Sequence, residues 1–350
     1  MNIRLFIFWL MDILGINALL RTINRYKAVI LWYHGICDDN FDLLKGYDER
    51  HISKSSFREQ MEYLKRKGYS FLTMTEFVST IKNKGKFHKN IVLTFDDGFK
   101  NVIKNAYPIM QEYNAKGCFY LVSDLTGTDN LLWTDYVETL IRNQKQGSYQ
   151  FDFKGKKYTY IFTDKKSYEK AMQDIKSKLR SISNTERLEH LKQFGDINIE
   201  NAPKEFALAS WEEVKELDPN VLEIGCHTRS HPNCTNLISD EELQNEIYHS
   251  KMDIENKTER KVEHFCYPAG SYDDRVIEKV ISSGYQSAVT IDYGFNSENT
   301  GLYRLKRVEA SPSLQEFKAR VSGSISFIKR LIKILQISRM RKIPRMALIY

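Results

Sequence analysis

The sequence predicts an α/β fold, a mostly parallel sheet covered by helices. Short apolar runs rich in β-branched and aromatic residues alternate with longer polar segments that open with helix-capping signals. This alternation of strand and helix is typical of parallel sheets. Hydrophobic residues make up 42% of the chain and charged residues 28%, as in ordinary folded proteins. The mean hydropathy of −0.48 argues against a polytopic membrane protein.

The strand-like segments are too short to be helices, and turn or helix signals bound them. They are residues 28–33, 91–95, 118–122, 221–225, 264–267 and 286–290. Three helices are expected to begin at capping boxes, in which a Ser or Thr is followed three residues later by a Glu. These pairs are Thr73–Glu76, Ser210–Glu213 and Ser239–Glu242.

Residues 131–205 interrupt this alternation. The stretch is polar and rich in lysine, and it contains one expected helix near 165–195. We interpret it as a helical insertion into a single domain that spans residues 28–325. Gly and Pro are sparse, so the sequence shows no obvious flexible linker.

The two ends of the chain have a different composition. Residues 1–27 include an apolar segment that is interrupted by Asp12 and is too short for a comfortable membrane span. It fits an interfacial anchor, or equally a terminal helix packed on the domain. Residues 326–350 mix Ile and Leu with Lys and Arg, which suits a helix on an anionic membrane or a solvated tail. We expect a cytoplasmic protein, peripheral at the inner membrane face.

The net charge of +7 is concentrated in one place. Residues 317–350 hold nine Lys or Arg and no acidic residue, so the remainder carries about −2. The main domain therefore has no basic face for nucleic acid. The five cysteines include no CxxC pair and lie mostly in apolar runs, so we expect buried thiols in a reducing compartment, with a disulfide as the alternative.

Three polar motifs follow strand-like runs, and chemistry collects at the carboxyl ends of strands in α/β folds. The first is Asp96-Asp97-Gly98, where adjacent carboxylates repel each other unless a cation holds one. The second contains His227 and His231, a spacing suited to binding a metal. The third is the loop formed by Tyr267, Pro268, Ala269 and Gly270, whose backbone N–H groups could form an oxyanion hole. Each motif taken alone could equally be an ordinary turn.

The first two motifs together supply two histidines and one carboxylate. Such a set serves either hydrolysis by a metal-bound water or oxygen activation by non-haem iron. A hydrolase needs a base beside the metal, and Asp96 is the natural candidate. The second carboxylate and the α/β pattern therefore favour a hydrolase.

The ordered motifs TFDDG, HTRSHP and FCYPAG resemble the polysaccharide deacetylases with a NodB homology domain (carbohydrate esterase family 4), from about Leu31 to Ser322. The resemblance implies a distorted (β/α) barrel and a bound Zn²⁺, or another divalent ion such as Co²⁺ or Ni²⁺. It implies that Asp96 is the catalytic base, that Thr228 is a supporting residue, and that residues 267–270 form the oxyanion hole and pocket wall. The implied metal ligands are Asp97, His227 and His231.

The chain departs from the family pattern at two points. Cys266 stands where many members have an Arg that orients the catalytic Asp, and Arg304 or Arg307 could take over that role. Many members also carry a Leu-x-His motif near the end of the domain, which is missing here. His34 follows the first strand and could act as the catalytic acid, as in the permuted poly-N-acetylglucosamine deacetylases.

The sequence therefore predicts a metal-dependent hydrolase that removes N-acetyl groups from an amino sugar. The substrate would be a bacterial surface glycan or its lipid-linked precursor. An O-deacetylase, or a non-catalytic sugar-binding relative, is the alternative. Trp133 and Trp211 are candidates for stacking on a sugar, although both suit a core equally well.

Overall fold

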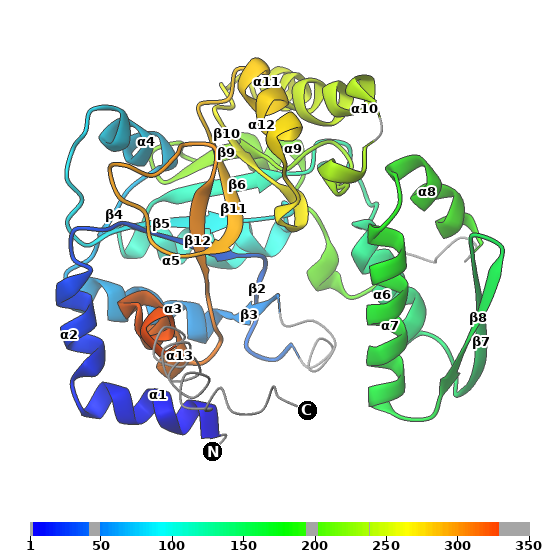
Figure 1. Cartoon of the computed structure of the whole chain (residues 1–350), viewed down its shortest axis with the longest axis horizontal. Coiled ribbons are helices and arrows are strands. Elements are labelled where there is room, and N and C mark those ends of the chain that lie inside the picture. The colour runs from blue at the N-terminus through cyan, green and yellow to red at the C-terminus, as the bar shows by residue number, and fades with distance from the viewer. Residues whose placement is uncertain (1–2, 42–49, 194–201, 238, 329–350) are drawn as a thin grey trace, which may run out of the picture.

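The computed structural model describes residues 3–41, 50–193, 202–237 and 239–328 (Figure 1). Seven parallel strands close into a barrel, because β1 pairs with β12 on one side and with β5 on the other. This confirms the predicted α/β class and the barrel that the resemblance implied. The barrel strands are β1 (Val29–Tyr33), β5 (Asn90–Phe95), β6 (Gly117–Leu121), β9 (Leu222–Cys226), β10 (His264–Cys266), β11 (Ser287–Tyr293) and β12 (Leu305–Glu309).

Six of these strands coincide with the predicted apolar runs to within a few residues. The seventh, β12, was not predicted, because only Leu305 and Val308 in its LKRVE sequence are aliphatic. Two smaller pairings complete the sheets. Strand β4 (Ser70–Phe71) adds to the amino end of β5, and β2 (Ile36–Cys37) pairs with β3 (Ile52–Ser53).

Side chains alternate between the two faces of the barrel wall, as the period of a strand requires. Ile30, Val92 and Leu305 share one cluster with the buried face of helix α4 (Met74–Lys82), whereas the sequence neighbours of Ile30 and Val92 join the larger cluster under the surrounding helices. Helix α4 therefore covers the apolar interior of the barrel at the amino ends of the strands. Polar side chains of the interior face, such as Thr94 and Arg307, come nearer the carboxyl ends.

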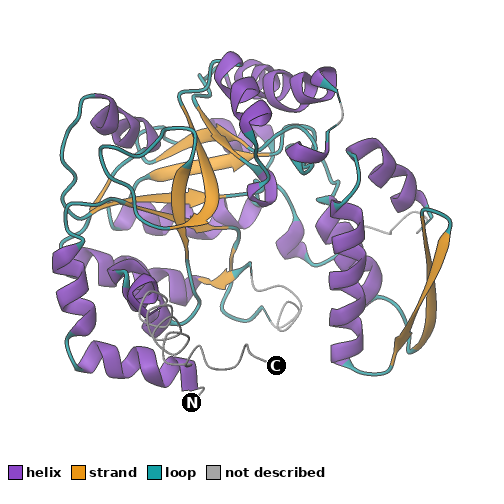
Figure 2. Cartoon of the chain, viewed as in Figure 1, coloured by secondary structure: helices purple, strands orange, loops and turns teal. Residues whose placement is uncertain are grey.

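Helices surround the barrel (Figure 2). They are α3 (Lys54–Arg66), α4 (Met74–Lys82), α5 (Tyr107–Glu112), α9 (Trp211–Lys215), α10 (Asp240–Gln244), α11 (Ser250–Thr258), α12 (Asp274–Ser282) and α13 (Leu314–Ser322). The three predicted capping boxes are all present, each with reciprocal hydrogen bonds between the cap and the Glu. These boxes satisfy amide groups that would otherwise lack a partner in the first turn.

The segment between β6 and β9 is not purely helical, which corrects the prediction. It holds α6 (Trp133–Arg142), the antiparallel hairpin of β7 (Gly147–Phe153) and β8 (Lys156–Phe162), α7 (Lys165–Arg180) and α8 (Asn184–Lys192). The expected helix near 165–195 is thus two helices. A separate hydrophobic cluster lies between α6, the hairpin and α7, so this subdomain lies beside the barrel with its own core (Figure 1).

The N-terminal segment forms α1 (Ile3–Ile13) and α2 (Ile16–Ile23). Phe8 and Met11 of α1 pack on Ala319 of α13. Among the described residues no single helix is long and apolar enough to cross a membrane; α1 and α2 meet that test only as a pair bent by 72°. The predicted C-terminal tail lies almost entirely outside the described residues.

Candidate metal centre

The first two motifs converge at the carboxyl end of the barrel. Asp97 comes two residues after β5, and His227 directly follows β9. The Oδ1 atom of Asp97 lies 3.4 Å from Nε2 of His227 and 3.4 Å from Nε2 of His231. The three side chains therefore present one oxygen and two nitrogens to a common point, as a tetrahedral metal site with an open position requires.

The backbone at this centre is held in an unusual conformation. Asp97, Thr228 and His231 have φ values of 76°, 68° and 59°, in the left-handed region that residues with a Cβ rarely adopt. Such conformations persist at functional sites where surrounding contacts enforce them. One of these contacts is the hydrogen bond that the His231 N–H donates to Oγ1 of Thr228, at 3.0 Å. Thr228 thus lies where the family resemblance implied a supporting residue.

Hydrogen bonding orients the His227 ring for metal binding. Its Nδ1 lies 2.8 Å from the backbone oxygen of Cys266. Because a carbonyl oxygen only accepts hydrogen bonds, Nδ1 must carry a proton, so Nε2 is the ring atom that would bind a cation. Burial lowers the pKa of His231 to about 3, so the His231 ring is neutral.

Asp97 is ionised despite its burial. Burial alone would raise its pKa, but the imidazole groups that face its two oxygens outweigh that effect and leave the pKa below its ordinary value. The Oδ1 atom is buried and has no hydrogen-bond partner among the described residues. A buried carboxylate oxygen facing two imidazole nitrogens fits a divalent cation.

Asp96 lies beside this group and is held by Arg307. The guanidinium donates from Nη1 to Oδ1 and from Nη2 to Oδ2, both at 2.8 Å. Arg307 also donates to Oγ1 of Thr94 and to the backbone oxygen of Thr290, which fixes the guanidinium plane. Burial would raise the pKa of Asp96, but Arg307 lowers it below its ordinary value.

Of the two arginines considered from sequence, the structure therefore selects Arg307. Arg304 is instead exposed and pairs with Asp274. Asp96, His227 and Cys266 also lie close enough to form a second possible ligand group. Both Asp96 oxygens are bound by Arg307, and burial raises the pKa of the Cys266 thiol. The group with Asp97 is the better metal site.

His34 lies at the same end of the barrel, just after β1. Its Nε2 is 3.8 Å from Oδ2 of Asp97, and its ring contacts the edge of Trp32. The side chain is only 15% exposed. His34 and Asp96 therefore both adjoin the Asp97 group, although they come from different strands.

The third motif also lies at this end. The N–H of Tyr267 donates to the backbone oxygen of Val289 at 3.3 Å, which extends the pairing of β10 with β11 by one residue. The expected role of this N–H as an oxyanion donor stays a prediction. Pro268, Ala269 and Gly270 form a single tight turn in which Ala269 is left-handed.

The subdomain contributes contacts to this centre that sequence reasoning did not foresee. Trp133 of α6 donates from Nε1 to the backbone oxygen of His231 at 3.0 Å, and Arg187 of α8 lies over the Trp133 ring at 4.4 Å. Trp133 is therefore a buried support of the metal loop rather than a sugar platform. Arg50 reaches toward the centre, 3.7 Å from Oδ2 of Asp97, and pairs with buried Asp135 of α6. The only sequence signal for this ion pair was Asp135, an acidic residue within the amphipathic helix α6.

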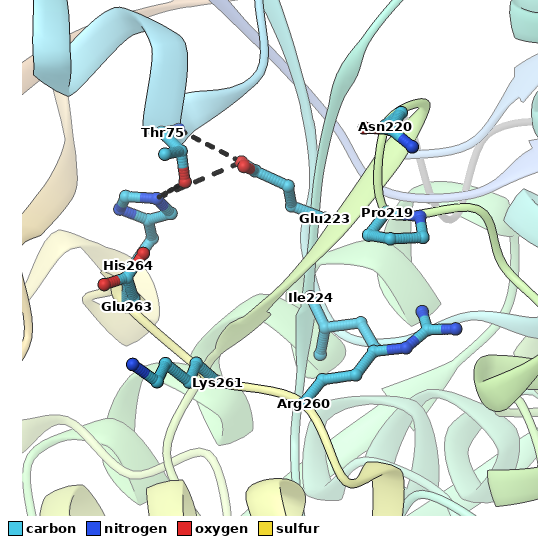
Figure 3. A pocket seen from close by; sticks show the side chains of 9 residues that line it. All are labelled: Thr75, Pro219, Asn220, Glu223, Ile224, Arg260, Lys261, Glu263 and His264. Atoms are coloured by element: carbon cyan, nitrogen blue, oxygen red, sulfur yellow. Dashed lines mark hydrogen bonds and ion pairs between the residues drawn. The ribbon is translucent and has the colours of Figure 1, made fainter.

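A cavity of about 410 Å³ lies at the other end of the barrel, near the first residues of β9 and β10 (Figure 3). Its titratable groups serve the structure. Glu223 accepts a hydrogen bond from the N–H of Thr75 in the first turn of α4, and His264 bonds to the hydroxyls of Thr75 and Ser287. The figure shows Thr75 between the Glu223 and His264 side chains. These partners explain both buried groups without a ligand.

Comparison with known proteins places this geometry in context. The family model described as polysaccharide deacetylase matches residues 83–192 and 193–288. The Bacillus subtilis protein YxkH, whose name describes it as a polysaccharide deacetylase, is 21% identical to this chain over 299 residues. The match covers 85% of this chain and 76% of YxkH. The poly-β-1,6-N-acetyl-D-glucosamine N-deacetylase of Staphylococcus aureus is 30% identical over 145 residues. That match covers 37% of this chain and about half (49%) of the relative.

A solved structure shares the fold. The deacetylase PplD of Streptococcus pyogenes, solved in complex with acetate, superposes with a TM-score of 0.57 at 19% identity. The superposition covers 85% of this chain and 98% of PplD. At that identity the likeness speaks for the fold alone, whereas the match to the family model covers more than half of the chain.

Proposed function

This chain belongs to the polysaccharide deacetylase family, and we propose that it is a metal-dependent enzyme that removes N-acetyl groups from an amino sugar. The observation that carries the proposal is the convergence of Asp97, His227 and His231, with the Asp96–Arg307 pair beside them. A non-catalytic sugar-binding relative would have no need for a base fixed next to three metal-ligand side chains.

Asp97, His227 and His231 would hold the ion, for which Zn²⁺ is the first candidate because its usual ligands are imidazole and carboxylate. When bound, such an ion polarises a carbonyl and lowers the pKa of coordinated water to roughly 7. The neutral form of His231 and the ionised form of Asp97 are the states that ligation requires.

Asp96 would accept the proton of the attacking water. The two hydrogen bonds from Arg307 hold its carboxylate in place and keep it ionised at neutral pH. His34, whose Nε2 lies 3.8 Å from Oδ2 of Asp97, would donate a proton to the departing amine nitrogen. Proton transfer by one positioned group is typically worth about 10²–10⁴ in rate. An amine leaves far less readily than an alkoxide without protonation, so a large His34 contribution favours N-deacetylation over O-deacetylation.

The substrate we propose is an N-acetylated amino sugar of a bacterial surface glycan or its lipid-linked precursor. The name of the Staphylococcus aureus relative supports the amino sugar. Purified protein should release acetate from N-acetylglucosamine oligomers, and chelation should abolish this until Zn²⁺ is restored. Absence of both bound metal and acetate release would refute the proposal, while bound metal without release would point to a narrower substrate.

We also propose that α1 and α2 dock on an anionic phospholipid surface at the cytoplasmic face. Their outward side carries exposed apolar residues, including Ile3, Ile13, Leu14, Leu19 and Ile23, each more than 60% exposed. Residues 329–350 hold seven Lys or Arg and no acidic residue. Ile325 and Ile328, among the last described residues before this basic segment, pack against Phe8 and Met11 of α1, and basic residues next to an apolar surface suit an anionic membrane.

Sedimentation with vesicles tests this docking. The full chain should bind vesicles containing phosphatidylglycerol at low salt and bind phosphatidylcholine vesicles weakly. The Leu14→Asp variant should reduce binding, while Ile281→Asp, at an exposed site on α12, should not. Equal binding by both variants would refute docking through α1 and α2, as would dimerisation that depends on Leu14.

A further inference from the structure

A buried glutamate outside the three motifs contacts the metal loop, residues 227–231. The Oε2 atom of Glu246 accepts hydrogen bonds from the backbone N–H groups of Arg229 and Ser230, both at 2.9 Å. The Ser230 hydroxyl donates to its Oε1 atom at 2.6 Å. Only 4% of Glu246 is exposed. Both oxygens of this carboxylate are therefore occupied by the segment between the two candidate histidine ligands.

The conformation of the metal loop matches this contact. Thr228 and His231, on either side of the two N–H groups, are left-handed, with φ values of 68° and 59°. Successive N–H groups that turn toward one side form a concavity that binds an anion, and here the Glu246 carboxylate fills it. Hydrogen bonds to an ionised acceptor are roughly twice as strong as neutral ones. They therefore help to offset the cost of two left-handed residues that carry a Cβ.

The carboxylate comes from a well-packed part of the barrel domain. Glu246 lies in a π-helical turn, Asn245–His249, that joins α10 to α11, and such turns are frequent at functional sites. Its neighbour Ile247 is fully buried in the main hydrophobic core. The Arg229 side chain reaches the same turn, where its Nη1 donates to Oδ1 of Asn245 at 2.6 Å. The core of the barrel domain thus fixes the group against which the metal loop is held.

Two donors from the subdomain hold the other side of the loop. Nε1 of Trp133 and Nη1 of Arg187 donate to the backbone oxygen of His231, at 3.0 and 3.4 Å. Burial lowers the pKa of Arg187 to about 10, and the charge of Glu246 opposes that effect. The loop therefore has its N–H groups bound by a buried anion and its carbonyl oxygen bound by a buried cation and an indole.

We infer that Glu246 is a positioning residue of the metal centre, which keeps the loop in the conformation that aims both histidine Nε2 atoms at Asp97. In that conformation the Nε2 atoms of His227 and His231 each lie 3.4 Å from Oδ1 of Asp97. The inference rests on the proposed function for the identity of the bound ion. Glu246 acts through the backbone of the loop, and partners that orient ligands in this way typically change metal affinity by about 10- to 100-fold when removed.

Zinc affinity of the full chain, measured by chelator competition, tests this role. Glu246→Met keeps the length of the side chain but cannot replace its hydrogen bonds, so Zn²⁺ should bind about 10- to 100-fold more weakly. Glu246→Gln keeps one oxygen acceptor and should recover part of the affinity, remaining about three- to tenfold weaker than the wild type. Glu223→Gln is the matched control, because it alters a mostly buried carboxylate that accepts from a helix N–H at the other end of the barrel. It should keep wild-type zinc affinity.

Hydrogen exchange of the metal-free protein reports on the loop without any ion. The amide groups of Arg229 and Ser230 should exchange about three- to tenfold faster in Glu246→Gln, while the amides of β9 keep their wild-type rates. A general loss of stability would instead speed exchange in β9 as well. This measurement therefore separates a positioning role from a merely structural one.

The outcomes also separate this inference from the proposed function. Wild-type zinc affinity in Glu246→Met overturns the inference even if the enzyme is active, and so does an equal loss of affinity in Glu223→Gln. Where Glu246→Met does not fold, unchanged affinity and exchange in Glu246→Gln overturn it. If the wild type binds no metal, the proposed function fails, while faster exchange confined to the loop still shows that Glu246 fixes the conformation between the two histidines.

Discussion

Replacing Arg307 tests how the Asp96 base is controlled. Arg307 is 1% exposed and supplies two hydrogen bonds of 2.8 Å to the buried carboxylate. Removing one member of such a buried pair typically costs about 3–5 kcal/mol of unfolding free energy. This is a large share of the roughly 5–15 kcal/mol that stabilises a typical protein. Arg307→Met is therefore expected to be poorly folded, and Arg307→Lys is the more informative variant.

Arg307→Lys keeps the positive charge but cannot make the paired contact. Hydrogen bonds to charged groups contribute about 1.5–3 kcal/mol each, so losing one predicts a fall in kcat/KM of roughly 10- to 100-fold. Burial raises the pKa of Asp96 and Arg307 lowers it, so weakening the pair should raise the pKa. The acid limb of the pH profile of kcat/KM should then move to higher pH.

The assay is acetate release at saturating Zn²⁺ across pH 4–9, with metal content and circular dichroism measured on each preparation. Arg304→Lys, at the exposed arginine three residues earlier, is the matched control and should behave like the wild type. An unchanged acid limb in Arg307→Lys, with folding and metal intact, would show that Arg307 does not set the pKa of the catalytic base.

Four further variants probe the remaining groups. Asp97→Ala should lose the metal, which elemental analysis measures, and metal retained by this variant would contradict the ligand assignment. Asp96→Asn should keep the metal and lose a factor of about 10²–10⁴ in kcat. His34→Ala should lose a similar factor on an N-acetyl substrate and much less on an O-acetyl ester; equal losses would exclude it as the acid for the amine. Burial lowers the pKa of His264 from 6.5 to about 3, so the folded state binds fewer protons than the unfolded state. Stability from this group is complete above pH 6.5 and declines as the pH falls toward 3, by up to about 1.4 kcal/mol per pH unit. His264→Gln should flatten that slope in urea unfolding, and an unchanged slope would refute the assignment.

The metal-ligand candidates could be found from sequence because each lies within a short motif directly after an apolar strand. Asp97 can be predicted once the end of β5 is located, and His227 and His231 once the end of β9 is located. The order of β strands then brings both ends to one face of the barrel without any further information. The site could thus be predicted from local patterns combined with a general property of α/β folds.

Arg307 could not be assigned in the same way. Its partner Asp96 is 211 residues away in sequence, and nothing in the sequence marks β12 as a barrel strand. Within β12 a buried position is occupied by the cation Arg307, and a cation would ordinarily indicate the solvent side. Only closure of the barrel through the pairing of β1 with β12 places the arginine over the carboxylate.

The subdomain supports the metal centre rather than merely lying beside the barrel. His231 is left-handed, so its loop needs contacts that hold the backbone in that conformation. Trp133 and Arg187 both donate to its backbone oxygen, and both come from helices whose main hydrophobic cluster is separate from the barrel. Trp133→Phe would preserve the packing and remove one donor. We therefore expect weaker metal affinity with little loss of global stability, which metal-chelator competition can measure.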